Sequence, residues 1–271
     1  MLIEVAAQGR VLQMKRSFTA PQQPPPRVPR GTITGFSKQS RKRLLKLTAR
    51  LELGKVKTTF LTLTFSTDQT HQEAKAALKR FTMRLRRRNP DVSGLWRMEY
   101  QERGVIHFHL VLFNMPFWAQ RDLQKVWEQC TKEKRSIVDI RLVHSPKQVM
   151  SYVSKYIAKE ERAETAPSLD SPTYQHEGYR ASTGRFWGYI NQDALPYAEI
   201  VRAVVTSPQV AYYLRWFISV SSHRSSAWGG LTAFLFSDEA HAILRATLSM
   251  CGIETFPAAQ SHNSVLASIF A

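Results

Sequence analysis

The chain has 271 residues, of which 43% are hydrophobic, and it carries a formal net charge of +17 with a sequence pI near 10.2. Its length permits a sizeable core, and its two cysteines exclude a disulfide scaffold or a cysteine-rich zinc module, so we expect a reducing, cytoplasmic setting. No apolar run reaches the roughly 18 residues of a membrane helix, the N-terminus lacks the order of a signal peptide, and so basic a chain typically binds a polyanion.

The first 36 residues are basic and weakly patterned. They contain a proline-rich run at 21–29 that continues neither a helix nor a sheet ladder, so we expect a Pro-rich N-terminal extension that acts as a linker. Hydrophobic periodicity and cap residues then predict, in chain order, a helix over 37–53, a strand over 58–66, a helix over 70–88, strands over 94–101 and 105–114, a helix over 119–134, a strand over 136–143 and a helix over 145–161.

This order is typical of an antiparallel sheet with helices packed on one face. The predicted fold class is therefore α+β, ferredoxin-like or RRM-like, in a domain over 37–192. An acidic loop follows residue 161, and a short strand is expected over 184–190. Residues 193–271 are predicted to form a mostly helical C-terminal segment whose role the sequence does not indicate.

The basic residues are concentrated before residue 160, because residues 160–271 contain seven arginines, no lysine and ten acidic residues. One basic cluster on a helix is usually a solvated face. Two clusters in a chain this basic instead favour contact with nucleic-acid phosphates. The candidate residues on the two predicted helices are Lys38, Arg41, Lys42, Arg43, Lys46, Arg84, Arg86, Arg87 and Arg88.

Two histidines, His107 and His109, alternate with Phe108 on a predicted strand, so both imidazoles point to one face and the apolar residues to the other. The hairpin turn centres near residue 103 and brings Glu99 opposite His107. One carboxylate and two imidazoles with open positions suit Mn²⁺ or Mg²⁺ better than a structural zinc. Alternatively, Glu99 is an ordinary solvent-facing residue, and Glu102 in the turn is a second candidate ligand.

The last helix of the predicted domain carries Tyr152, Lys155, Tyr156 and Lys159 on one face, separate from its apolar stripe. A phenol is a poor nucleophile until it is activated or placed in line with its target, and a lysine beside it can stabilise negative charge. Together with a metal, this face predicts attack of a tyrosine on a phosphodiester. Strand joining then needs no ATP, and the chain has no glycine-rich phosphate loop.

Three motifs, in this order, resemble those of the HUH endonuclease superfamily, in particular the two-tyrosine rolling-circle replication initiators of small single-stranded DNA phages and related plasmids. They are FLTLTF at 60–65, HFH at 107–109 and YVSKYIAK at 152–159. The downstream GRFWGYI at 184–190 also resembles a segment of the phage-type members. The resemblance covers about residues 58–190 and leaves both ends of the chain unexplained.

The resemblance implies nicking of one strand of single-stranded or cruciform origin DNA, a 5′-phosphotyrosyl intermediate and a free 3′-hydroxyl. It implies a divalent metal, Mg²⁺ or Mn²⁺, held by His107 and His109 with Glu99 as third ligand. Tyr152 and Tyr156 would be alternating nucleophiles, with Lys155 and Lys159 as auxiliary cations. Arg97 and Arg185 complete the candidate phosphate contacts. A host helicase and polymerase would act with it in the cytoplasm of a bacterial host.

Two other functions remain open. A relaxase or tyrosine transposase would use the same chemistry, although two tyrosines and a long basic N-terminal extension disfavour the transposase. A non-catalytic, RRM-like binding module for single-stranded nucleic acid would display aromatic residues on its open sheet face. Glu99, His107 and His109 are predicted there instead, which favours the enzyme.

Overall fold

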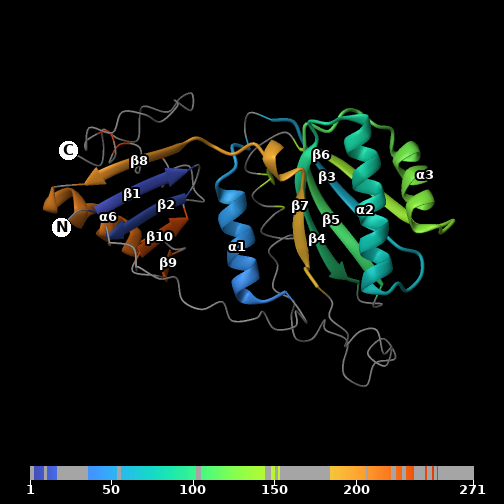
Figure 1. Cartoon of the computed structure of the whole chain (residues 1–271), viewed down its shortest axis with the longest axis horizontal. Coiled ribbons are helices and arrows are strands. Elements are labelled where there is room, and N and C mark those ends of the chain that lie inside the picture. Colours follow the sequence, from blue (N-terminus) through green and yellow to red (C-terminus); the bar gives the residue numbers. More distant parts are fainter. Residues whose placement is uncertain are drawn as a thin grey trace, which may run out of the picture. The chain divides into compact units, whose positions relative to one another are not determined.

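The computed structural model describes residues 3–8, 11–16, 36–53, 56–101, 105–143, 148–149, 152, 184–205, 207–220, 224–227 and 230–234, and three single positions, 242, 246 and 249. The chain divides into two compact units. The central unit comprises residues 26–48 and 52–196, and the terminal unit comprises residues 1–25, 49–51 and 197–271. Each unit has its own sheet (Figure 1).

The central unit contains a five-stranded sheet in the order β6-β3-β5-β4-β7, with every neighbouring pair antiparallel. This confirms the predicted α+β class, and the first four strands have the order of a ferredoxin-like sheet. The elements in chain order are α1 (Lys38–Ala49), β3 (Thr58–Thr64), α2 (His71–Arg88), β4 (Ser93–Tyr100), β5 (Ile106–Phe113), α3 (Gln120–Thr131), β6 (Ile137–Val143), β7 (Trp187–Ile190) and a short 3-10 turn, η3 (Gln192–Ala194).

Helices α2 and α3 cover one face of this sheet and form the core with it (Figure 1). Phe81 of α2 and Trp127 of α3 meet edge to face, and the Trp127 indole N–H donates to the Thr64 carbonyl at 3.0 Å. The strand residues that point into this core are fully buried, and they include Leu61, Leu63, Phe108 and Leu110.

The ends of α2 follow the local sequence. The Thr70 hydroxyl accepts from the Glu73 backbone N–H at 3.2 Å, and the Glu73 carboxylate accepts from the Thr70 backbone N–H at 3.1 Å. This is the predicted capping box. The helix ends at Arg88 because Asn89, its C-cap, is extended and precedes Pro90.

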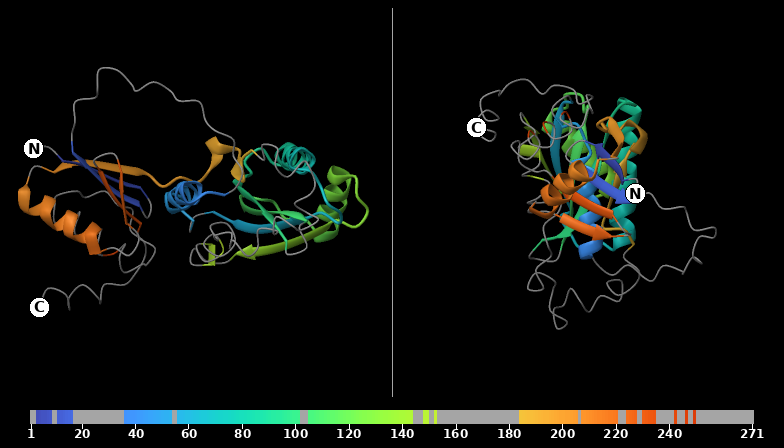
Figure 2. Two further views of the ribbon diagram at one scale, coloured as in Figure 1. Left: turned by 90° about the horizontal axis from the view of Figure 1, so that it is seen from below. Right: turned by 90° about the vertical axis from the view of Figure 1, so that its left-hand side faces the viewer.

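Helix α1 lies on the opposite side of the sheet from α2 and α3 (Figures 1 and 2). The Trp187 indole N–H of β7 donates to the Ser40 hydroxyl of α1 at 2.7 Å. Just before α1, the Phe36 ring lies 4.5 Å from the Arg97 guanidinium of β4. The polar face of the sheet is therefore partly covered by α1 and the residue preceding it.

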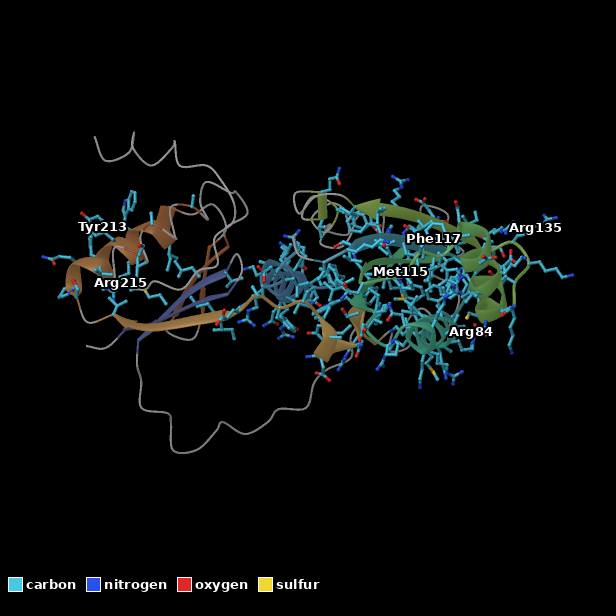
Figure 3. The ribbon with its side chains drawn as sticks, turned by 90° about the horizontal axis from the view of Figure 1, so that it is seen from above. Arg84, Met115, Phe117, Arg135, Tyr213 and Arg215 are labelled. Atoms are coloured by element: carbon cyan, nitrogen blue, oxygen red, sulfur yellow. The ribbon has the colours of Figure 1, made fainter. Side chains whose placement is uncertain are left out.

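The terminal unit contains a second antiparallel sheet, in the order β8-β1-β2-β10-β9. Helix α6 packs on this sheet with Ala211, Leu214 and Ile218 buried. Its other side exposes aromatic residues, among them Tyr213, which Figure 3 labels beside Arg215. The elements are β1 (Ile3–Gln8), β2 (Val11–Arg16), β8 (Ile200–Val205), α6 (Pro208–Val220), β9 (Arg224–Ala227) and β10 (Gly230–Phe234).

This sheet corrects two predictions. Residues 3–16 are not part of an extended N-terminal extension, since β1 and β2 pair with each other and with β8 and β10. The described part of residues 193–271 contains three strands beside α6, so it is not mostly helical. The strands are short and their partners lie about 190 residues apart, so local patterns gave no sign of the pairing. Within the described residues, no helix is both long and apolar enough to cross a membrane.

Candidate metal centre

Strand β5 separates its side chains by alternation. Phe108 and Leu110 point into the helix-covered core, and His107 and His109 point to the opposite face. Across the β4–β5 hairpin, Glu99 pairs directly with His107, and Arg97 pairs with His109. The predicted register of the hairpin is therefore confirmed.

The three predicted ligands converge. One Glu99 carboxylate oxygen, Oε2, lies 3.0 Å from His109 Nε2 and 3.5 Å from His107 Nε2. One possible ligand atom from each residue lies within 4.8 Å of the others, an arrangement that can hold a metal ion. The alternative ligand Glu102 lies outside the described residues.

The electrostatics of this cluster favour the protonation states that a cation requires. Burial alone raises the pKa of Glu99, but hydrogen bonds from His107 and His109 and the charge of Arg97 outweigh it and hold the pKa well below its usual range. Burial lowers the pKa of His109, although Glu99 acts in the opposite direction. The carboxylate stays ionised and the imidazole neutral near neutral pH, and metal ligation needs both.

Arg97 occupies a different place from the one expected of a phosphate contact. Its side chain is fully buried, on the same sheet face as Glu99 and against the Phe36 ring. In this arrangement it acts on the cluster through its charge, since its guanidinium does not reach solvent.

A residue that sequence reasoning missed supports His109 from the neighbouring strand. Thr62 of β3 pairs with His109, and its hydroxyl lies 3.3 Å from His109 Nδ1. A hydrogen bond at one imidazole nitrogen orients the ring and leaves the other nitrogen free for a metal. The signal was present in the sequence, because Thr62 and Thr64 alternate with the core residues of the FLTLTF strand.

Tyr152 lies over the same face of the sheet. Its ring stacks on Phe60 of β3 with the centroids 3.6 Å apart and the planes 11° apart. Its hydroxyl lies 3.3 Å from His109 Nδ1, the atom that Thr62 also contacts. A strand therefore positions the ring, and the hydroxyl meets the candidate metal cluster. Lys155, Tyr156 and Lys159 lie outside the described residues.

The predicted phosphate contacts fall on both sides of the sheet. Those of α1 lie on the metal side, whereas those of α2 lie on the far side with the core between. Arg84 donates to the Gln129 side chain at 2.7 Å, and Arg88 stacks on Trp118. Arg185 is exposed just before β7, at the end of the sheet that holds Glu99. The structure thus does not bring the α2 arginines to the metal cluster.

Comparison with known proteins adds a family to this geometry. Residues 58–161 match the family model of the replication-associated proteins of the ORF2 and gene 2 protein type. The match begins with β3 and includes the cluster, Tyr152 and Tyr156. It supports a role in initiating replication and DNA as a partner.

One solved structure is similar to part of the chain, the crystal structure of the hypothetical protein ORF119 from Sulfolobus islandicus rod-shaped virus 1. The sequence identity is 17% and the TM-score 0.31, over 45% of this chain and 96% of the other. No curated protein matches the chain.

Proposed function

We propose that the protein initiates rolling-circle replication by nicking one DNA strand at an origin and later rejoining it. The observation that carries the proposal is the place of Tyr152, whose hydroxyl meets His109 on the sheet face that holds Glu99 and His107. The match of residues 58–161 to a replication-associated family supports the biological setting.

Glu99, His107 and His109 would hold Mg²⁺ or Mn²⁺, for which an ionised carboxylate and neutral imidazoles are a suitable donor set. When bound, the ion polarises the scissile phosphodiester and offsets the negative charge that develops during the reaction. With Nε2 of His109 serving as a ligand, its Nδ1 carries the ring proton and donates toward Thr62 or Tyr152.

In the cleavage step, the Tyr152 hydroxyl oxygen attacks phosphorus. The new oxygen–phosphorus bond forms as the bond from phosphorus to the 3′-oxygen breaks, and the electron pair stays on that oxygen. The phenol loses its proton and the 3′-oxygen gains one, which leaves a 5′-phosphotyrosyl link and a free 3′-hydroxyl. Because the link conserves a phosphoester, the reverse attack by a 3′-hydroxyl rejoins the strand without ATP.

Tyr156 follows Tyr152 by four residues, about one helical turn if the predicted helix continues. We propose it as the second nucleophile, which cuts again while the first strand end is still bound, with Lys155 and Lys159 as cations near the phosphate. A helicase and a polymerase of a bacterial host would extend the released 3′-hydroxyl.

The test is to incubate the full chain and Mn²⁺ with a fluorescent, randomised library of single-stranded oligonucleotides. We expect a covalent adduct that survives SDS, with the DNA attached to Tyr152 or Tyr156 in the mapped peptide. The Tyr152→Phe/Tyr156→Phe double variant and the His107→Ala/His109→Ala double variant should form none.

Three outcomes would contradict the proposal. An adduct on another residue would assign a different nucleophile, and an adduct in the double histidine variant would exclude the cluster. Tight binding of the library with no adduct in any divalent metal would favour a non-catalytic binding module. Sequencing the captured strands separates an origin from the ends that a relaxase or a transposase would cut.

A further inference from the structure

The turn between α3 and β6 carries four consecutive charged residues, Lys132, Glu133, Lys134 and Arg135. The three basic side chains are exposed, whereas Glu133 is partly buried. None of the three was among the predicted phosphate contacts, because the acidic residue in the middle dilutes the sequence signal. We call Lys132, Lys134 and Arg135 the basic lip.

Glu133 is directed inward by the loop that follows β3. Its carboxylate accepts from the backbone N–H groups of Ser66 at 2.9 Å and Thr67 at 3.3 Å, and from the Gln69 side chain at 3.0 Å. The Thr67 hydroxyl donates to it as well. Burial raises the pKa of Glu133, but these bonds outweigh it and keep the group ionised. The turn therefore turns its acid inward and presents three cations to solvent.

The basic lip lies at the end of the sheet that holds the candidate metal cluster. The turn leads into Ile137, which pairs with Thr64, and Thr64 in turn pairs with His107. Ile137 is thus two strands from His107, about 10 Å at ordinary strand spacing. Its side chain is 57% exposed and lies on the face of the cluster. Further along β6, Asp139 pairs with Arg141 at 3.0 Å, so it adds little net negative charge.

The basic surface of α2 makes an instructive contrast. Lys79, Arg86 and Arg87 are as exposed as the lip, but they stand on the helix that covers the other face of the sheet. Figure 3 shows Arg135 at the end of the central unit and Arg84 on α2. A strand bound to α2 would have to pass around the sheet to reach Tyr152.

We propose that the basic lip binds the backbone phosphates of single-stranded DNA, and that the strand crosses Ile137 to reach the metal cluster. The inference rests on the proposed function and specifies how its substrate approaches. Three exposed cations complement phosphates, and the exposed Ile137 offers apolar contact to an unstacked base, which a duplex does not present.

The test measures binding of the full chain to fluorescein-labelled oligothymidylate by anisotropy over a range of salt concentrations, without divalent metal. The lip variant is Lys132→Gln/Lys134→Gln/Arg135→Gln, and the matched control is Lys79→Gln/Arg86→Gln/Arg87→Gln, with the same change in charge. We expect the salt dependence of the lip variant to become shallower by about 2 in log K against log salt, since each single-strand phosphate contributes roughly 0.7. The control should keep a slope close to wild type.

Ile137→Thr gives an independent readout. It should weaken binding of the oligothymidylate without changing the salt slope, because it removes an apolar contact and no charge. The proposal is overturned if the lip variant keeps the wild-type slope, if the α2 control loses as much, or if Ile137→Thr binds like wild type. Because the assay needs no cleavage, it decides the lip even if no tyrosine adduct forms, an outcome that would refute the proposed function alone.

Discussion

The two faces of the central sheet are built from the same strands and do different work. On the helix-covered face, Phe108 and Leu110 are fully buried between β5 and the helices. On the other face, His107 and His109 meet a carboxylate and a tyrosine. Because neighbouring residues serve opposite faces, stability and chemistry can be changed separately on one strand. The predictions below test this separation, from the largest expected effect to the smallest.

The His107→Ala/His109→Ala variant should lose Mn²⁺ binding, with affinity more than about 100-fold weaker, since removing two of three ligands exceeds the 10–100-fold cost typical of a supporting group. Calorimetric titration with Mn²⁺ measures the affinity, and thermal unfolding without metal serves as the control. We expect a melting temperature close to wild type, because neither imidazole belongs to the core. A large fall in that temperature would contradict the separation of the two faces.

Phe108→Ala should produce the reverse result. We expect the free energy of unfolding to fall by about 3–5 kcal/mol, because the substitution leaves a cavity between β5 and the helices. Urea denaturation measures the change. Under conditions where the variant remains folded, its affinity for Mn²⁺ should match wild type; selective loss of metal binding would show that the two faces are coupled.

Thr62→Val should weaken Mn²⁺ binding by about tenfold, because it removes the hydroxyl that contacts His109 Nδ1 while keeping the side chain's shape. Thr62→Ser is the matched control and should stay near wild type. Long-range proton–nitrogen NMR of the His109 ring gives a second readout, since the Val variant should show a mixture of tautomers in the metal-free protein. Equal affinities in Val and Ser variants would leave Thr62 with a packing role.

The smallest effect concerns His71, which lies on the helix side of the sheet beside Tyr100 and Phe186. Burial, with a smaller contribution from Lys75, lowers the pKa of His71 from 6.5 to about 4. The unfolded chain therefore binds an extra proton between these pH values, so the free energy of unfolding falls as the pH falls from 6.5 to 4. In His71→Gln, denaturation curves at several pH values should show a weaker decline, and an identical decline would exclude His71 as its source.

Much of the central unit follows from local sequence. The capping box at Thr70 gives the start of α2, and alternation along β5 separates the core residues from the histidines. The turn near residue 103 sets the hairpin register and hence the partner of His107. Each of these features depends on residues within about ten positions of one another, so pattern and turn chemistry are sufficient.

What the sequence did not predict depends on contacts across the fold. No local pattern places the Tyr152 ring on Phe60 or directs Glu133 to the loop at Ser66. The basic residues of α2 had the right composition for phosphate contact, but only the packing of their helix decides which side of the sheet they occupy. The N-terminal strands, whose outer partners come from residues 200–234, were missed for the same reason.

The pairing of those strands has a consequence for the order of events during synthesis. The hairpin of β1 and β2 leaves the ribosome early, but β8 and β10, its partners on either side, follow about 190 residues later. At roughly 5–20 residues per second, the hairpin waits on the order of 10–40 s with both edges unpaired. All the strands of the central sheet emerge within this interval. The nascent chain can therefore assemble its metal-side sheet before its own beginning has found a partner, and a chain cut short before β8 would keep that hairpin as an open template for aggregation.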